Sequence, residues 1–219
     1  MSEPEVSFEE FAVVACGTLG MELSHLKKSG FLNARKLLFT KPGRHEVPRE
    51  LESQLVERIR VAKRFADKVI VVYGGKFCYI NANDPYRTID GIIEEQGPGI
   101  ARINATHCVD MLAGAAERER ISGGDKVFWL TPGWVVYKEN VFEDWDEGKA
   151  NETFPQNGGG AILLDAVGFW EEFSESQPEK LLEFSDWMGI PIRPHPVSPA
   201  RFKGLLSECA LELRSTGTA

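Results

Sequence analysis

Several features are scarce or missing in this chain of 219 residues, and each absence narrows what the protein can do. Basic residues are outnumbered, with 25 Lys and Arg against 33 Asp and Glu, which gives a net charge of −8. Such an acidic surface has no broad basic face for phosphates, so we expect no general binding to nucleic acid or to an anionic membrane. No apolar run reaches the roughly 18 residues that span a bilayer. The acidic, polar N-terminus does not resemble a secretory signal, so the sequence predicts a cytoplasmic protein.

Cysteine is also scarce. Four cysteines in 219 residues are too few for a disulfide framework, and thiols stay reduced in the cytoplasm. Each cysteine is therefore a buried small residue, a metal ligand or a reactive thiol. Two common site signatures are missing as well. There is no C-x-x-C pair, and Gly74-Gly75-Lys76 lacks the full spacing of a phosphate-binding loop.

What is present is an alternation of short apolar runs with helical patterns. We expect strands at residues 11–15, 34–40, 68–73, 100–103, 126–130, 160–165 and 191–193. Strands that alternate with helices require crossover connections, which favour a mostly parallel sheet covered on both faces. The predicted fold class is therefore α/β, an open three-layer α/β/α sandwich with about six or seven strands in its sheet. We expect a single domain over residues 1–219, with frayed ends at 1–10 and 214–219.

Three cysteines follow predicted strands, at the edge where open parallel sheets bind ligands. Cys16 follows the first strand, Cys78 the third, and His107-Cys108 the fourth. Thiolates are soft ligands, so these residues are candidate metal ligands for zinc, an iron–sulfur cluster or a metal-containing cofactor, with His107 as a possible fourth ligand. Cys209 lies in a helical pattern and is expected to be structural.

The sequence leaves other interpretations of these cysteines open. A cysteine after a buried strand is often only a compact core residue. Alternatively, Cys108 could be the nucleophile of a small transferase or hydrolase, activated at a helix N-terminus. A ligand-free interaction domain is a third possibility.

Several polar and aromatic residues at the same edge are candidates for contact with a bound molecule. Arg102 could meet a carboxylate or phosphate, and Asn104 lies in the same polar band, although helix capping and surface ion pairing explain such residues equally well. Trp134 follows a strand end and could form the wall of a pocket. Arg44 and His45 follow the second strand, and His195 follows the last.

Four segments together resemble the uncharacterised family catalogued as domain of unknown function 1638. These segments are Val14-Ala-Cys16-Gly17-Thr-Leu19, Val71-Val-Tyr73-Gly74 with a nearby cysteine, His107-Cys108-Val-Asp110-Met-Leu112, and Leu130-Thr-Pro-Gly-Trp134. The resemblance runs from about Phe11 to Leu206, and Cys16, Cys78 and Cys108 each match one of its segments. It implies an α/β domain without an established activity and adds Tyr73 and Gly74 to the candidate cofactor-binding residues. It also implies an accessory role in corrinoid-dependent methyl transfer, with a corrinoid as a further candidate cofactor and proteins of such methyltransferase systems as partners.

Overall fold

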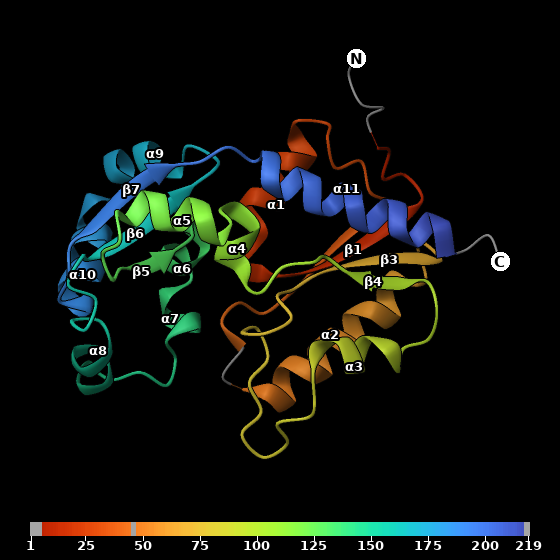
Figure 1. Cartoon of the computed structure of the whole chain (residues 1–219), viewed down its shortest axis with the longest axis horizontal. Coiled ribbons are helices and arrows are strands. Elements are labelled where there is room, and N and C mark those ends of the chain that lie inside the picture. Colours follow the sequence, from red (N-terminus) through yellow and green to blue (C-terminus); the bar gives the residue numbers. More distant parts are fainter. Residues whose placement is uncertain (1–5, 45–46, 217–219) are drawn as a thin grey trace.

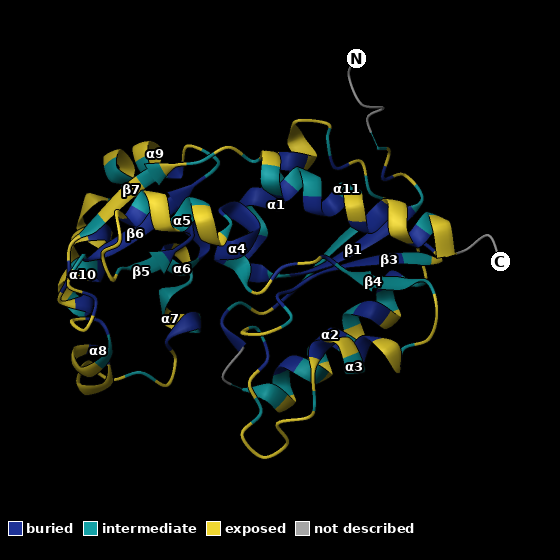
Figure 2. Cartoon of the chain, in the orientation of Figure 1, coloured by how far each residue is buried: buried dark blue, intermediate teal, exposed yellow. Residues whose placement is uncertain are grey.

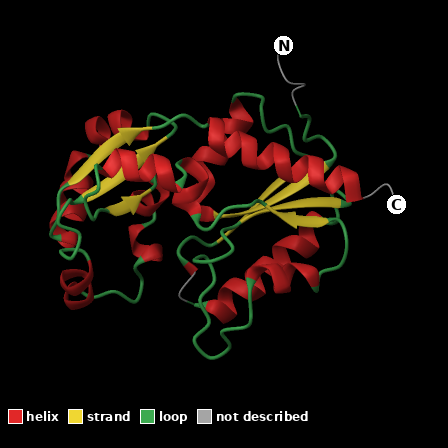
Figure 3. Ribbon diagram, in the orientation of Figure 1, coloured by secondary structure: helices red, strands yellow, loops and turns green. Residues whose placement is uncertain are grey.

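The computed structural model describes residues 6–44 and 47–216 (Figure 1). Its strands form two parallel sheets, which appear as two separate groups of arrows in Figure 3. The helices pack around and between these sheets. The α/β class and the parallel pairing predicted from the sequence are confirmed.

The first sheet has the strand order β2-β1-β3-β4, and all its strands are parallel. Its members are β1 (Phe11–Cys16), β2 (Lys36–Thr40), β3 (Lys68–Val72) and β4 (Ile100–Arg102). The register pairs Ala15 of β1 with Phe39 on one side and with Val72 on the other. The carboxyl ends of β1, β2 and β3 therefore lie side by side.

The second sheet has the order β5-β6-β7 and is also parallel. It consists of β5 (Phe128–Leu130), β6 (Ala161–Asp165) and β7 (Ile192–Pro196). β7 contains Pro194 and Pro196, which lack a backbone N–H, and it accordingly lies at an edge with β6 as its one neighbour among the described strands.

The helices connect these strands and cover them. They are the 3₁₀ turn η1 (Gly17–Leu19) and the helices α1 (Gly20–Lys28), α2 (Pro48–Ala62), α3 (Ile89–Glu94), α4 (Cys108–Leu112), α5 (Ala115–Ser122), α6 (Pro132–Val136), α7 (Lys138–Val141), α8 (Glu147–Thr153), α9 (Phe169–Ser176), α10 (Pro178–Met188) and α11 (Ala200–Ser215). In Figure 1, α1 and α11 cover one face of the first sheet, and α2 and α3 cover the other.

Alternate residues of β1 point to these two faces, as expected for a strand. Val13 and Ala15 pack in a cluster with α1 and α11, whereas Ala12 and Val14 pack in a cluster with α2 and α3. The first of these clusters also contains Ile162 of β6, so the two sheets share a continuous core. Figure 2 shows the result, with β1, β3 and β6 buried inside and exposed residues on the outer sides of the helices.

One expectation about the architecture needs correction. The seven predicted strands all form, but they are divided between two sheets, so each sheet is smaller than the one of six or seven strands that we expected. Near the ends of the described residues, Phe8 is fully buried and Arg214 pairs with Glu10 at 2.5 Å, while the single domain and the frayed ends stay predictions. Residues 1–5 and 217–219 lie outside the described residues. Across the described part of the chain, no helix combines the length and apolar character needed to cross a membrane.

Candidate functional site

Six of the predicted site residues line one cavity of about 330 Å³: Cys16, Tyr73, Cys78, His107, Cys108 and Trp134. The order of the first sheet explains its position. The chain leaves β1 for β2 on one side and later reaches β3 on the other side, so the switch in strand order lies between the neighbouring strands β1 and β3. Ligands bind to open α/β sheets at such a reversal, outside the carboxyl ends of the strands. Cys16 ends β1, and Tyr73 directly follows β3.

A close approach between two loops brings the second and third cysteines to this edge. A Cβ atom on Gly74 would lie 2.3 Å from the Thr106 carbonyl oxygen, so a larger residue would force the loops apart. The backbone N–H of Gly75 donates to the carbonyl of Ala105 at 2.9 Å. Gly74 is therefore not in the wall of the cavity. Its role is to let the loop that carries Cys78 lie against the segment that leads to Cys108.

Hydrogen-bond donors surround the sulfur of Cys16. The Thr18 hydroxyl donates to Sγ over 3.1 Å. The Tyr73 hydroxyl is also within hydrogen-bonding reach of this sulfur and shares a short hydrogen bond with the Thr40 hydroxyl. Burial raises the pKa of Tyr73 well above its usual value, so its hydroxyl stays protonated and can donate.

Donors also face the other two sulfurs. Burial raises the pKa of the Cys78 thiol, and the neighbouring sulfurs of Cys108 and Cys16 raise it further, while the backbone N–H groups of Gly74 and Cys108 act in the opposite direction. Burial likewise raises the pKa of Cys108 to about 12, against hydrogen bonds from the Trp134 indole and the backbone of Val109. Both thiols are therefore neutral at pH 7 although donors are placed to stabilise the thiolate form.

His107 is held by the first turn of α4. Its Nδ1 accepts a hydrogen bond from the Asp110 backbone N–H at 3.1 Å and so caps the helix. Its ring packs against Phe77, with the ring centroids 5.7 Å apart. Burial and the nearby Arg118 lower the pKa of His107, which favours the neutral imidazole. With Nδ1 used as a cap, Nε2 is the nitrogen left to contact a bound group.

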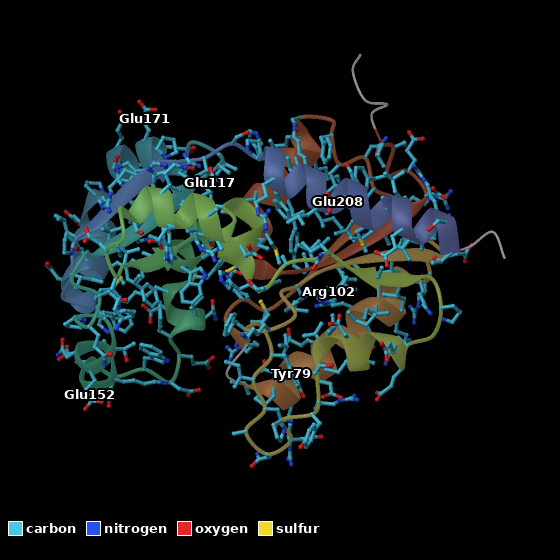
Figure 4. All side chains as sticks on the ribbon, viewed as in Figure 1. Tyr79, Arg102, Glu117, Glu152, Glu171 and Glu208 are labelled. Carbon is cyan, nitrogen blue, oxygen red and sulfur yellow. The ribbon has the colours of Figure 1, made fainter. Side chains whose placement is uncertain are left out.

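Two further predicted residues lie away from the cavity wall. The Arg102 guanidinium binds both carboxylate oxygens of Asp90 on α3, at 2.7 and 3.0 Å (Figure 4). It also donates to the carbonyl oxygens of Tyr73 and Ala105, so it ties together the loops that follow β3 and β4. Asn104 is exposed and borders a different surface hollow, beside the start of α5.

Two of the remaining candidates lie away from the cavity. His195 lies within β7, in the second sheet, and does not line the cavity. His45 lies outside the described residues. Cys209 is buried in α11, within the core, as expected.

Sequence reasoning missed several residues of the cavity wall. Phe77 and Ile80 line the cavity and are 48% and 52% exposed, which puts apolar side chains at its mouth. Arg44 lines it too, although its side chain is only 5% exposed. The one signal for Arg44 was its position just after the second strand, and nothing in the sequence distinguished it from a surface residue.

Convergence in one cavity does not amount to a preformed single-ion site. Within residues 6–44 and 47–216, no three His, Cys, Asp or Glu side chains are grouped closely enough to hold one metal ion. The three cysteine residues have intermediate exposure and border the cavity, although the thiol groups of Cys78 and Cys108 are themselves buried. A water molecule takes up about 30 Å³ of liquid, so a cavity of about 330 Å³ has far more room than one ion needs.

The fold and the cavity define a parallel α/β protein with a thiol-lined pocket at the carboxyl edge of its first sheet. The chain belongs to the family described as protein of unknown function (DUF1638), whose model matches residues 39–206. The match includes Cys78, His107, Cys108 and Trp134, whereas Cys16 precedes it. No curated protein and no solved structure matches the chain.

Proposed function

We propose that this protein binds a metal cofactor in the cavity, through the thiolates of Cys16, Cys78 and Cys108. The observation that carries the proposal is the set of hydrogen-bond donors around the three sulfurs. Hydrogen bonds to coordinating sulfur are a general means by which proteins tune metal–thiolate centres. A cysteine that serves only as core filling has no need of such donors.

The raised pKa values of Cys78 and Cys108 support the same conclusion. Two buried thiolates would repel each other, and the donors alone do not bring either thiol to ionise at pH 7. A metal centre would supply the missing positive charge, because a coordinating thiol is deprotonated outright. Binding would then release protons, in keeping with the general coupling between metal affinity and pH.

The size of the cavity favours a cofactor larger than one zinc ion. Sulfur atoms around one zinc lie about 3.5–4 Å apart, from bond lengths near 2.3 Å. The cysteine sulfurs of an iron–sulfur cluster are farther apart, about 6–7 Å. The cavity of about 330 Å³ has room for an iron–sulfur cluster but not for a whole corrin macrocycle, so a cluster is the cofactor that it suits best, with His107 Nε2 as a candidate fourth ligand. Such a group would supply redox or Lewis-acid chemistry. The accessory role in corrinoid-dependent methyl transfer stays a prediction.

The test is anaerobic purification followed by metal analysis and an optical spectrum, with and without reconstitution by iron and sulfide, zinc or a corrinoid. We expect stoichiometric metal in the wild-type protein and its loss in the triple variant Cys16→Ser, Cys78→Ser, Cys108→Ser. Cys209→Ala is the matched control, since this cysteine lies in α11 and away from the cavity. Wild-type protein without stoichiometric zinc, iron or cobalt, or a triple variant with unchanged metal content, would contradict the proposal.

The rival function, catalysis by a Cys108 nucleophile, requires a thiol that ionises readily. Burial has the opposite effect on Cys108 and raises its pKa to about 12. Alkylation of the native protein separates the two functions. One fast-reacting thiol whose modification abolishes a measurable turnover would favour the nucleophile, and protection of all three cavity thiols by the bound metal would favour the cofactor site.

A further inference from the structure

Arg44 is a buried cation at the wall of the cavity. The nitrogen atoms of its guanidinium group differ in the partners that they contact. The two Nη atoms pair with Glu50, at 3.5 Å, and with Glu143, whose side chains are 40% and 50% exposed. These pairs therefore face the surface. The Nε–H is buried and has no hydrogen-bond partner among the described residues.

A buried guanidinium N–H without an acceptor is unfavourable, and native proteins rarely leave one. Arg44 also lines the cavity. The simplest explanation is that the acceptor for Nε belongs to a molecule that binds there. A buried donor at the wall of an otherwise apolar pocket is the usual means of fixing the orientation of a small ligand.

The rest of the wall restricts what this ligand can be. Besides Arg44 and the cysteines, the cavity is bordered by apolar and aromatic side chains: Leu19, Leu51, Val72, Met111, Phe77 and Trp129. The part of the ligand that lies against these residues must be apolar, since a polar group there would lose its contacts with water. The volume of about 330 Å³ is at the lower end of the range for small-molecule sites.

The charges around Arg44 determine the kind of acceptor. Lys41 also contacts Glu143, at 3.7 Å, so two positive side chains already face the two carboxylates of Glu50 and Glu143. A ligand carboxylate would add an unbalanced negative charge to this group, and a buried unbalanced charge is costly. A neutral carbonyl oxygen accepts the same hydrogen bond without that cost.

We infer that the cavity binds a small organic molecule with an apolar body and one neutral carbonyl group, an amide or a ketone, whose oxygen accepts a hydrogen bond from Arg44 Nε. This inference goes beyond the metal site and does not require it, because it rests on the Arg44 Nε, unpaired among the described residues, and not on the cysteine sulfurs.

The experiment compares three probes of similar shape by calorimetry and ligand-observed NMR: benzamide, benzoate and toluene. Benzamide offers a neutral acceptor, benzoate a charged one and toluene none. We expect benzamide to bind the wild-type protein about tenfold to a hundredfold more tightly than toluene, the gain from one hydrogen bond to a charged donor, and also more tightly than benzoate. Equal affinities for benzamide and toluene, tighter binding of benzoate, or no detectable binding of any probe would overturn the inference.

Variants identify the donor. Arg44→Lys keeps the positive charge beside Glu143 but has no Nε–H, so benzamide should lose its advantage while toluene binds as before. Arg58→Lys is the matched control, because the Nε of Arg58 donates to the carbonyl of Phe39 at 2.9 Å and this residue is not part of the cavity wall. A wild-type preference for benzamide in Arg44→Lys, or the same loss in Arg58→Lys, would refute the assignment to Arg44. The probe series in the wild-type protein remains decisive if Arg44→Lys fails to fold.

The same measurements on the triple cysteine variant keep this inference separate from the metal site. A preference for benzamide that survives in a variant without metal supports the organic ligand alone. Metal binding without any preference among the probes supports the metal site and overturns the organic ligand.

Discussion

Glu22 is a buried carboxyl group that makes the stability of the protein depend on pH. It lies in α1, is only 2% exposed, and neither of its carboxyl oxygens has a hydrogen-bond partner among the described residues. Burial raises its pKa from 4.5 to about 8, and the nearby Asp165 adds to this effect. Glu22 is therefore protonated in the folded protein at pH 7, whereas it is ionised in the unfolded chain.

The sign and size of the effect follow from linkage. Because the folded state holds the proton more tightly, stability falls as the pH rises above the unfolded pKa of 4.5, and the loss is complete above the folded pKa of about 8. At about 1.4 kcal/mol for each pH unit, the loss is below about 1 kcal/mol at pH 5 and reaches about 4 kcal/mol at pH 8. Glu22→Gln removes the titrating group and keeps its shape, so this variant should gain about 3.5 kcal/mol relative to the wild type between pH 5 and pH 8.

The assay is urea unfolding of both proteins at several pH values, followed by circular dichroism. Groups other than Glu22 titrate equally in the two proteins and cancel in the difference. Glu152→Gln is the control, since Glu152 is exposed on α8 (Figure 4) and its substitution should leave the pH profile unchanged. A difference between Glu22→Gln and wild type that stays constant from pH 5 to pH 8 would refute the reasoning.

Four further outcomes are expected. Gly133→Ala should destabilise the protein by several kcal/mol, because its Cβ would lie 1.9 Å from the Thr18 carbonyl oxygen, where α6 packs on η1. Gly204→Ala in α11 meets no atom within 4 Å and should instead stabilise it by about 0.5–1 kcal/mol, so thermal unfolding that ranks the two variants equally would contradict this packing. Asp110→Asn should cost about 1–2 kcal/mol, since it weakens the partly exposed ion pair with Arg201 at 3.0 Å, and a double-mutant cycle of the two residues checks the coupling; additive effects would argue against it. In metal-free protein at pH 8, Cys108 should react with iodoacetamide far more slowly than a free thiol and become reactive only on unfolding, whereas rapid reaction of the native protein would show that burial does not protect it.

Local patterns in the sequence were sufficient to locate the strands, but they did not decide between helix and loop over residues 135–154, where α7 and α8 form. All seven expected strands form, and the apolar spacing at Leu51, Leu55, Ile59 and Ala62 gives the buried face of α2. The pairing of strands could not be read in the same way. A run of apolar residues indicates a strand but does not say which other strand it joins, and the division after β4 depends on packing between residues far apart in the chain.

The candidate site was likewise predictable only in part, because some of its contacts join residues that are far apart in the chain. The rule that ligands bind at the carboxyl ends of parallel strands correctly brought Cys16, Cys78 and Cys108 to one cavity. It could not find the role of Arg44, because that role depends on Glu143, 99 positions further along the chain. Nor could it show that the guanidinium of Arg102 already has partners and holds two loops together, since those partners come from three separate segments.

The position of α11 has a consequence for how the protein is made. This last helix follows β7 of the second sheet, yet its apolar residues Phe202, Leu206 and Leu213 pack in the cluster that covers β1 and β3 of the first sheet. During synthesis, the first four strands and α1 leave the ribosome well before α11 does. The part of that face that α1 leaves uncovered therefore stays open to water until the second sheet and α11 have been made, so the core of the first sheet is completed late.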